Sequence, residues 1–479
     1  MRFGTIAQHN SGKTLDSGRN TGQLRDYITT SNLYWGRFDL VSVRQMPIAD
    51  DELNKCTARK GDLLICEGGE AGRAAVWPYN HEVCFQNHVH RARFYGEEID
   101  PYFVYRFFEK LNATGELNQH RKGVGISNMS SKALALIVVP LPPHFEQHHI
   151  VAKVDELMAL CDQLEQQQTH SLAAHQTLVE TLLGTLTRVE SQQEFSAAWA
   201  RIASHFDTLF TTEASIDRLK QILLQLAVMG KLVPQDPNDE PASALLRRIA
   251  AEKDKLIKQK EIKTDKPLPP ISEEEKPFEL PPTWEFTHLQ EICSLITDGT
   301  HQTPTYTSEG RPFISAQCVK PFQFLPENCR FVSEENYQEY VRNRKPELGD
   351  ILLARVGAGI GEAAVIDVDL EFAIYVSTGL LKLFREYVVP SYLALWLNSP
   401  IGRHYSASRT LGKGVSQGNL NLSLIRSFVV SIPPNNEQHR IVAKVDELMA
   451  LCDTLKARIK DAQTTQLHLA DAIVEQAVC

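Results

Sequence analysis

The chain has 479 residues, of which 43% are hydrophobic, and its formal net charge is −9. This length and composition exclude a single small domain and a disordered chain, and they predict about two to four domains with real hydrophobic cores. The net acidity argues against a protein that binds nucleic acid through its total charge, so any such binding requires a local basic surface.

The cysteines and the hydropathy pattern indicate the cellular compartment. The nine cysteines form no CxxC pair, and Cys161 and Cys452 occupy apolar positions of two identical segments. This usage predicts reduced core residues in a cytosolic protein. The N-terminus lacks the apolar run of a signal peptide, and no stretch approaches the ~20 apolar residues of a membrane span. We therefore expect a soluble cytoplasmic protein with no metal site and no membrane segment.

Residues 1–143 are predicted to form a globular α+β domain. Short apolar runs bounded by glycine and proline predict strands at 62–65, 74–77 and 135–139. The segment 102–110 has amphipathic spacing and predicts a helix.

A long helix is predicted from residue 144, after a Pro-Pro turn. Apolar residues recur at three- and four-residue steps from Ile150 to Leu164, and this spacing is typical of a heptad seam. Further amphipathic patterns follow, so residues 144–262 are expected to hold the long helix and an extra helical segment. Residues 263–282 are rich in Pro, Glu and Lys and predict an extended linker.

The second half of the chain repeats the first. Residues 150–162 and 441–453 share the sequence IVAKVDELMALCD, 291 residues apart. The order of shorter patterns also recurs, which predicts a second globular domain at 283–434 and a second long helix at 435–479. Each helix spans on the order of 65 Å and must bury its apolar stripe, for which antiparallel pairing of the two copies is the obvious solution. The predicted fold is α+β, with two similar globular domains joined by two long antiparallel helices in a coiled coil, as a pseudo-twofold repeat.

The two halves differ where their globular domains begin. The second domain is preceded by Leu280-Pro-Pro-Thr-Trp284, and the first has no counterpart of this segment. Either the first strand of the first domain is shortened, or the C-terminal end of the chain packs near Met1 and completes it.

Patterns for catalysis are weak. Residues 11–14 read SGKT, but a P-loop would need glycine where Ala7 stands. The glycines of 357–361 follow an apolar strand, and a tight turn is favoured over a cofactor cradle because no Asp-Pro-Pro-Tyr-like motif accompanies them. Glu146 and Glu437 at the helix starts predict structural capping by a carboxylate. The residues therefore predict a non-catalytic protein.

Several of these features resemble the DNA-specificity subunit of type I restriction–modification enzymes. They are the two Pro-Pro-x-x-Glu-Gln blocks with the repeated helix start, the paired Gly-Asp and Lys-Gly-Val turns, and the segments 219–246 and 298–304. The resemblance implies two target recognition domains, each reading half of a split DNA sequence. Because the loops of the two domains differ widely, two unlike half-sites and an asymmetric target are expected.

The resemblance also implies partners. Two methyltransferase subunits would dock on the helices, and motor-nuclease subunits would complete the complex. S-adenosylmethionine, ATP and Mg²⁺ would be held by those partners, so no cofactor is expected on this chain, and the chain itself would not be an enzyme. Double-stranded DNA is the expected ligand.

The expected DNA contacts are cationic and amide side chains, which read base edges in the major groove or bind phosphates. In the first domain they are Lys13, Arg19, Arg25, Arg44, Arg73, Arg121 and Lys122; in the second they are His301, Gln302, Arg311, Arg355, Arg409 and Lys413. The expected contacts of the two helices with methyltransferase subunits are Lys153, Glu156, Lys444 and Glu447. For any single position, an ordinary solvated charge is the alternative.

Two other functions are also open. A single-chain DNA methyltransferase would bind S-adenosylmethionine by itself, so calorimetry on the isolated chain separates that hypothesis. A coiled-coil scaffold with two adaptor domains would bind no duplex DNA of any sequence, even with a methyltransferase partner present.

Overall fold

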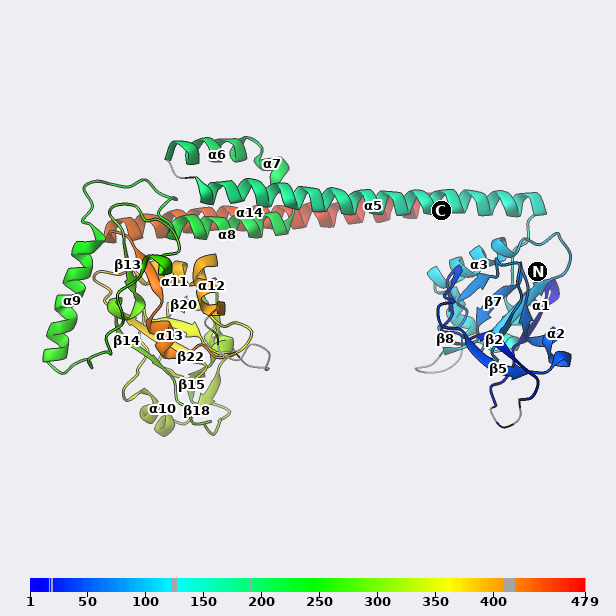
Figure 1. Ribbon diagram of the computed structural model, residues 1–479, viewed down its shortest axis with the longest axis horizontal. Coiled ribbons are helices and arrows are strands. Elements are labelled where there is room, and N and C mark those ends of the chain that lie inside the picture. The colour runs from blue at the N-terminus through cyan, green and yellow to red at the C-terminus, as the bar shows by residue number, and fades with distance from the viewer. Residues whose placement is uncertain are drawn as a thin grey trace. The chain divides into compact units, whose positions relative to one another are not determined.

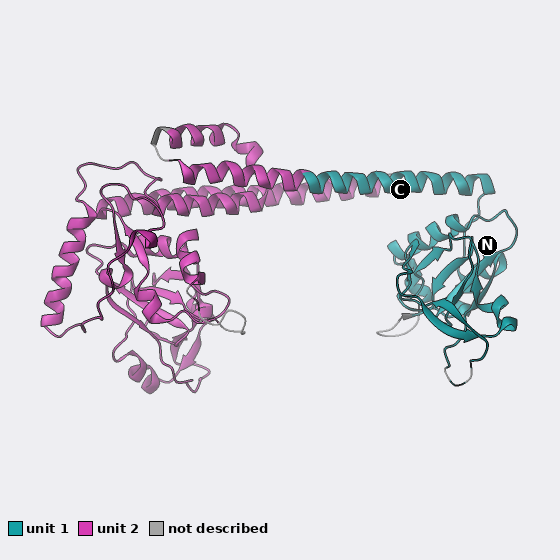
Figure 2. Cartoon of the chain, viewed as in Figure 1, with its two compact units in different colours: residues 1–170 teal, residues 171–479 magenta. Residues whose placement is uncertain are grey.

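The computed structural model describes residues 1–479 except 17, 19, 122–126, 190–191, 409, 411–417 and 479. Figure 1 shows its helices and strands, and Figure 2 shows two compact units, residues 1–170 and 171–479. The division falls inside helix α5 (His144–Arg188), whose first part belongs to the first unit.

The first unit consists of a globular domain and the first part of α5. Its two four-stranded sheets have the orders β1-β11-β7-β9 and β5-β2-β10-β6. The strands of the first sheet are β1 (Ala7–Ser11), β11 (Val89–Phe94), β7 (Leu63–Cys66) and β9 (Ala74–Val76). Those of the second are β5 (Arg44–Ile48), β2 (Gln23–Ile28), β10 (Val83–Phe85) and β6 (Thr57–Ala58). Helix α3 (Pro101–Ala113) packs on the first sheet through an apolar core that includes Phe3 and Phe108.

Shorter elements complete this domain. They are α1 (Phe3–Ile6), β3 (Leu33–Tyr34), β4 (Arg37–Phe38), η1 (Asp50–Glu52), α2 (Leu53–Cys56), β8 (Gly68–Gly69), η2 (Glu116–His120), β12 (Ser127–Asn128) and α4 (Ser131–Leu136).

The strand predicted at 135–139 is wrong. Residues 135 and 136 belong to the end of α4, and residues 137–139 make only a short pairing with residues 1–3. At the corresponding place in the second unit, β23 (Val429–Ile432) pairs over its full length with β13 (Glu285–His288). The pairing in the first domain stops at Phe3, because helix α1 begins there.

The second unit holds a globular domain of the same design. Its larger sheet has the order β14-β22-β19-β20, antiparallel throughout like β1-β11-β7-β9, and a three-stranded sheet has the order β18-β15-β21. The strands are β14 (Cys293–Asp298), β22 (Thr378–Leu383), β19 (Ile351–Ala354), β20 (Ala363–Val365), β18 (Arg330–Val332), β15 (Arg311–Ile314) and β21 (Ala373–Ile374). Its helices are α10 (Glu334–Val341), α11 (Pro390–Asn398), α12 (Pro400–Ser408) and α13 (Leu422–Arg426). The repeated sequence patterns therefore fold into sheets with the same strand order in both domains.

The glycine-rich segment 357–361 is a tight turn, as predicted. It joins the antiparallel strands β19 and β20, and the Gly361 amide donates to the Ala354 carbonyl at 2.8 Å. Gly357 and Gly361 have φ angles of 93° and 84°, which favour glycine because other L-residues are strained there.

Three helices pack together in the second unit: the last part of α5, α8 (Glu213–Val228) and α14 (Asn435–Val478). α8 and α14 are antiparallel, since Lys456 contacts Asp217 at 2.8 Å while Lys220 contacts Asp453. α5 runs parallel to α8, because His175 lies by the start of α8 and Thr187 lies by Lys231, just beyond its end. The last part of α5 and α14 are therefore antiparallel. The remaining helices of this region are α6 (Gln192–Ser204), α7 (Phe206–Leu209) and α9 (Ala242–Lys258).

The seam of the long helices is buried over only part of its length. Val179, Leu183 and Cys452 are buried in one core with α8. By contrast, Leu164 is 55% exposed and Ile473 is 58% exposed. The repeat predicts that the two long helices cover each other's seam, whereas in the structure α8 supplies much of the apolar surface that covers it. Cys452 is buried as expected, but Cys161 is exposed, so its assignment as a core residue was wrong.

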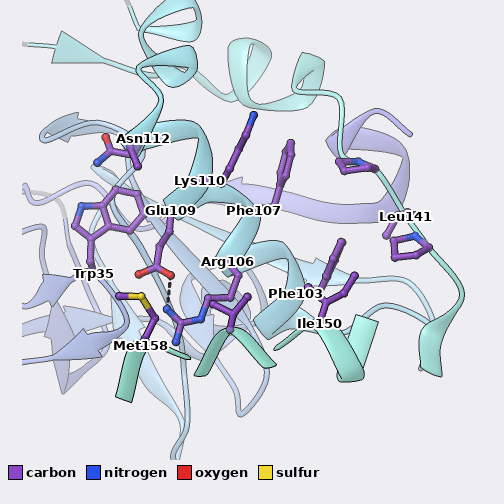
Figure 3. A pocket seen from close by; sticks show the side chains of 14 residues that line it. Trp35, Phe103, Arg106, Phe107, Glu109, Lys110, Asn112, Leu141, Ile150 and Met158 are labelled. Atoms are coloured by element: carbon purple, nitrogen blue, oxygen red, sulfur yellow. Dashed lines mark hydrogen bonds and ion pairs between the residues drawn. The ribbon is translucent and has the colours of Figure 1, made fainter. Parts of the chain in front are cut away.

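An open apolar groove lies in the first unit between α3 and the start of α5 (Figure 3). Its volume is about 1080 Å³. The side chains that give it its apolar character are Trp35, Phe103, Phe107, Leu141, Ile150, Val154 and Met158. Over the residues that the structure describes, every helix is too short or too polar to span a lipid bilayer.

Candidate DNA interface

Each globular domain carries an exposed loop where the first strand of an antiparallel four-stranded sheet ends, β1 in the first domain and β14 in the second. These loops are residues 12–22 after β1, of which 17 and 19 are not described, and residues 299–310 after β14; they are called the first and second strand-end loops here. Both begin with a glycine that no other residue could replace without a shift of the backbone. A Cβ on Gly12 would lie 2.0 Å from the Phe85 carbonyl oxygen, and one on Gly299 would lie 2.0 Å from that of Ile374.

The next residue of each loop is fixed in the same way. The Lys13 amide donates to the Phe85 carbonyl at 3.0 Å, and the Thr300 amide donates to the Ile374 carbonyl at 3.0 Å. Lys13 forms a parallel bridge with Gln86, as Thr300 does with Tyr375. Equivalent backbone positions therefore present two loops of unlike sequence.

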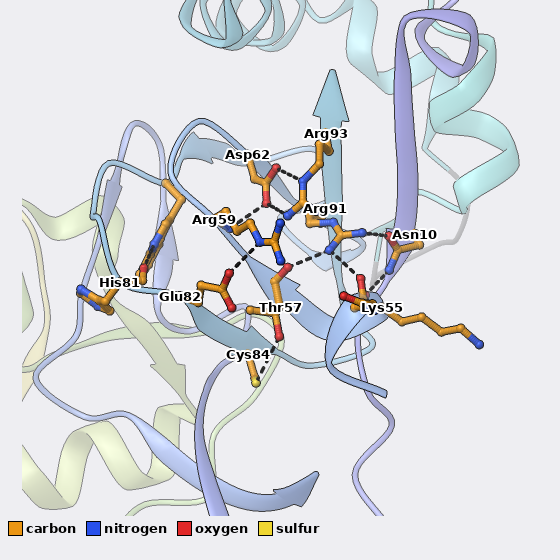
Figure 4. Close-up of polar contacts among 12 residues, drawn as sticks. Asn10, Lys55, Thr57, Arg59, Asp62, His81, Glu82, Cys84, Arg91 and Arg93 are labelled. Atoms are coloured by element: carbon orange, nitrogen blue, oxygen red, sulfur yellow. Dashed lines mark hydrogen bonds and ion pairs between the residues drawn. The ribbon is translucent and has the colours of Figure 1, made fainter. Parts of the chain in front are cut away.

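A buried arginine holds the base of the first strand-end loop (Figure 4). Arg91 donates to the Thr57 carbonyl at 2.7 Å and to the Asn10 side-chain oxygen at 2.7 Å. The Asn10 amide in turn donates to the Lys55 carbonyl, so β1 is tied to α2. Burial lowers the pKa of Arg91, and these hydrogen bonds offset the cost of placing its charge in the interior.

A different pair of arginines holds the base of the second strand-end loop. Arg355 is 5% exposed and forms a buried ion pair with Asp298, while its Nε donates to the Leu420 carbonyl at 2.9 Å. Arg344 donates to the carbonyls of Asp298 and Gly299 at 2.9 and 2.8 Å. The structure disfavours the predicted contact of Arg355 with DNA, because its guanidinium is buried and bound inside the domain. Its place is structural, at the root of the loop.

Three basic residues of the first domain are surface candidates, and two of them, Lys13 and Arg25, form ion pairs with carboxylates of the short helix η1. Lys13 forms an ion pair with Glu52, and this hydrogen bond lowers the pKa of the Glu52 carboxyl. Arg25 pairs with Asp50 at 2.9 Å. Arg44 is exposed on β5, the strand that pairs with the one carrying Arg25. These three stay candidates for phosphate or base contacts.

Arg73 and Arg121 are mainly bound within the first domain. Arg121 donates three hydrogen bonds of 2.7 to 2.8 Å: its Nε donates to the Ala71 carbonyl, and its two Nη atoms donate to two asparagine side chains. Arg73 donates to the Thr30 carbonyl at 2.6 Å and pairs with Glu70. Either arginine would have to give up these bonds to reach DNA, so the structure disfavours both as contacts.

The second strand-end loop presents His301 and Gln302 at the surface. The His301 side chain is 72% exposed, and its Nε2 lies 3.3 Å from the Asp298 carboxylate. Arg311, on β15 just after the loop, forms ion pairs with Glu334 and Glu371, and the bond to Glu334 raises the pKa of Arg311. The predicted residues Arg19, Lys122, Arg409 and Lys413, with both Lys-Gly-Val turns, lie outside the described residues.

Arg330 is a surface cation that the sequence analysis missed. It is exposed, and its guanidinium lies 4.5 Å from the centre of the Tyr306 ring in the second strand-end loop. The backbone brings them together, because Thr307 bridges to Phe331. No local sequence signal could have shown this pairing, since the two residues are far apart in the chain.

The residues predicted to meet methyltransferase subunits form the same ion pair in both repeats. Lys153 contacts Glu156 at 2.8 Å on α5, and Lys444 contacts Glu447 at 2.9 Å on α14. The exposed fractions of these four side chains lie between 41% and 66%. Such exposed pairs contribute little to stability, so they leave the helix surfaces available for a partner.

Comparison with known proteins identifies the two domains. A family model described as "Type I restriction modification DNA specificity domain" matches residues 2–174 and 281–463. The specificity subunit of the type I restriction enzyme EcoAI of Escherichia coli is 43% identical over 349 residues, 71% of this chain and 58% of that protein. The EcoEI specificity subunit, also of Escherichia coli, is 40% identical over 354 residues, again 71% of this chain and 58% of the relative.

The fold has a counterpart among solved structures. A chain from a structure described as the basis of complex assembly and conformational transition of the type I R-M system superposes with a TM-score of 0.53 at 16% identity, covering 100% of this chain and 96% of that chain. The chain therefore shares its fold. It matches 58% of the length of each of the two curated relatives named above.

Proposed function

The chain belongs to the type I restriction modification DNA specificity family, and from this premise we propose that it is the DNA-recognition subunit of a restriction–modification complex. In this proposal each globular domain reads one half of a bipartite, asymmetric DNA target. The domains do so by placing the strand-end loops and neighbouring side chains in the major groove, where every base pair presents a distinct donor and acceptor pattern.

The observation that carries the proposal is the pair of strand-end loops. Gly12 and Gly299 fix the start of both loops in the same backbone geometry, while the side chains beyond them differ completely. The two domains share one scaffold, but their exposed loops differ in sequence. This combination is expected of a protein whose two domains bind two different DNA half-sites with the same loop geometry. A coiled-coil scaffold with two adaptor domains would give no reason for this arrangement.

We assign no catalytic step to this chain. Methylation and cleavage would belong to separate methyltransferase and motor-nuclease subunits, which would hold S-adenosylmethionine, ATP and Mg²⁺. Lys153 and Glu156 on α5, with Lys444 and Glu447 on α14, would lie in the methyltransferase contact. Lys13, Arg25 and Arg44 would bind phosphates and set the register of the first domain, and affinity would then fall with salt concentration.

Mapping of modified adenines tests the proposal. The full chain is expressed with its methyltransferase subunits in a host without other adenine methylation, and modified positions are read by long-read sequencing. We expect one motif with two unlike specified parts and a fixed unspecified gap. An uninterrupted motif would contradict the bipartite account, and S-adenosylmethionine binding by the isolated chain in calorimetry would favour a single-chain methyltransferase instead.

A further inference from the structure

Arg330 is an arginine of the second domain whose donor groups are not used within the protein. It is exposed on β18, and its guanidinium forms no hydrogen bond or ion pair with the residues that the structure describes. Arg311, Arg344 and Arg355 of the same domain, by contrast, are bound to carboxylates or carbonyls. The five N–H donors of the Arg330 guanidinium are therefore available to a ligand.

The Tyr306 ring holds this guanidinium in place. The charge lies over the ring, 4.5 Å from its centre, an arrangement in which the cation is attracted to the aromatic face. The same ring packs against Phe313, with 6.1 Å between the ring centres. Phe313 is 2% exposed and is the cross-strand partner of Arg330 where β15 lies beside β18 (Figure 1). Tyr306 thus connects an exposed cation to a buried core residue.

The backbone brings Tyr306 to this position. The Thr307 amide donates to the Phe331 carbonyl at 3.0 Å, so the second strand-end loop is bonded to β18. Gly310 has a φ of 140°, and a Cβ at this position would lie 2.5 Å from the Val332 carbonyl oxygen. The loop is therefore held against β18 at two points. Because the contact between ring and guanidinium is built into the domain, less conformational freedom is lost when a ligand binds.

The geometry points to a base as the ligand of Arg330: we propose that its guanidinium donates two hydrogen bonds to O6 and N7 of one guanine in the major groove, and that Tyr306 is the positioning residue. The proposal rests on the proposed function, in which the second domain reads its own half-site. Guanine presents two adjacent acceptors that match the fork of an arginine. Restriction of the guanidinium by a ring favours such a two-point contact, whereas a phosphate needs only a positive charge.

Arg342 provides a matched control. It follows α10 and is exposed, and in the described part of the chain its guanidinium has no hydrogen bond or ion pair and lies over no aromatic ring. Replacement of Arg342 by alanine removes the same charge from the same domain as replacement of Arg330. A difference between the two variants is therefore not an effect of net charge.

The test measures base preference in the complex of the full chain with its methyltransferase subunits. The motif is first mapped from modified adenines, and the half-site of the second domain is the half that remains when residues 1–143 are exchanged. Duplexes in which each G·C pair of this half-site is replaced by A·T are then titrated. Arg330→Ala should lower the preference for guanine at one position by about tenfold or more, and other positions should keep theirs. Arg342→Ala should leave every preference within about twofold.

Two further substitutions separate the charge of Arg330 from its geometry. Arg330→Lys keeps the charge without the planar fork, so affinity should stay within a few-fold while the preference at the same position falls. Tyr306→Leu removes the ring and should lower that preference too, whereas Tyr306→Phe keeps the ring and should preserve it. A purely structural role of Tyr306 would instead lower the affinity for all duplexes by the same factor.

The outcomes distinguish this proposal from the proposed function. A wild-type complex without a bipartite motif contradicts the proposed function itself. With a bipartite motif in hand, unchanged preferences in Arg330→Ala overturn the proposal, and so does an equal loss of affinity for all duplexes, which would show a phosphate contact. If Arg330→Ala does not fold or binds no duplex, Arg330→Lys decides, because a lysine variant with the wild-type preference at every position overturns the two-point contact.

Discussion

Gln147 and Gln438, 291 residues apart, make the same set of hydrogen bonds at the starts of the two long helices. The Gln147 side-chain oxygen accepts from the Asp100 amide at 2.9 Å, and its nitrogen donates to the carbonyls of Glu98 and Pro142 at 3.1 and 2.9 Å. Gln147 is only 2% exposed, so this glutamine fastens α3 and the Pro-Pro turn to the start of α5.

Gln438 repeats this contact in the second unit. Its oxygen accepts from the Val389 amide at 2.8 Å, and its nitrogen donates to the carbonyls of Tyr387 and Pro433. The glutamine of each Glu-Gln pair is therefore a buried clamp between a globular domain and its helix.

Replacement of Gln147 by leucine should loosen this junction. The change leaves the Asp100 amide and two carbonyls without their side-chain partner, which costs about 2–3 kcal/mol of local stability. Native-state hydrogen exchange should show faster opening of the first turns of α5, with α14 unaffected. Gln168→Leu, at an exposed position of the same helix, is the control. Equal exchange in both variants would show that the clamp contributes nothing.

Replacement of Arg355 by methionine should destabilise the second domain by about 3–5 kcal/mol, because Asp298 keeps a buried charge without its partner. Thermal unfolding measures the effect. The double variant Arg355→Met with Asp298→Asn should recover part of it, since the unpaired charge is then removed. A double variant no more stable than Arg355→Met would contradict the pairing.

Lys13 is expected to bind a phosphate of the first half-site. Lys13→Gln should weaken duplex binding by similar factors across all sequences and should reduce the slope of log affinity against log salt by about one. Filter binding of the complex with its methyltransferase subunits at several salt concentrations provides the measurement. Lys110→Gln, on α3, should leave the slope unchanged. If the slope is unchanged in Lys13→Gln, Lys13 binds no phosphate and only forms its ion pair with Glu52.

The ion pair between Asp239 and Arg440 predicts a pH dependence. Arg440 donates to Asp239 at 2.6 Å and lowers the pKa of this carboxyl below its ordinary value of 3.8. A carboxyl whose pKa is lower in the folded than in the unfolded state stabilises the fold. This stabilisation is complete at pH values above the unfolded-state pKa, and it is lost as the pH falls through the folded-state pKa. Asp239→Asn should therefore lower the urea midpoint of the second unit between pH 5 and 7, and the difference should shrink below about pH 3.8. A difference that persists at low pH would contradict this assignment.

The repeat made much of the fold predictable. Identical sequences at 150–162 and 441–453 indicated two long helices and two related domains, and the structure has both. Burial was not predictable in the same way, since Leu157 is 49% exposed while its identical counterpart Leu448 is partly buried and packs against a core. Sequence identity fixes the apolar stripe, but the element that covers it is decided by tertiary structure.

The candidate site was predicted less well, and the buried arginines show why. The sequence around Arg91 and Arg355 does not distinguish these buried residues from surface cations. Their burial follows from partners far away in the chain, such as Asn10 and Asp298. Lys13 and His301 stay predictions, and the structure adds that each lies in a loop that begins with a glycine. Arg330 was missed because its partner Tyr306 is contributed by another segment.

Exchange of one domain tests the central claim most directly. Residues 1–143 are replaced by the corresponding domain of a relative with a different target, and modified adenines are mapped with the same methyltransferase subunits. We expect a hybrid motif in which one half is new while the other half is retained. A motif that changes in both halves, or in neither, would contradict the claim that each domain reads its own half of the target.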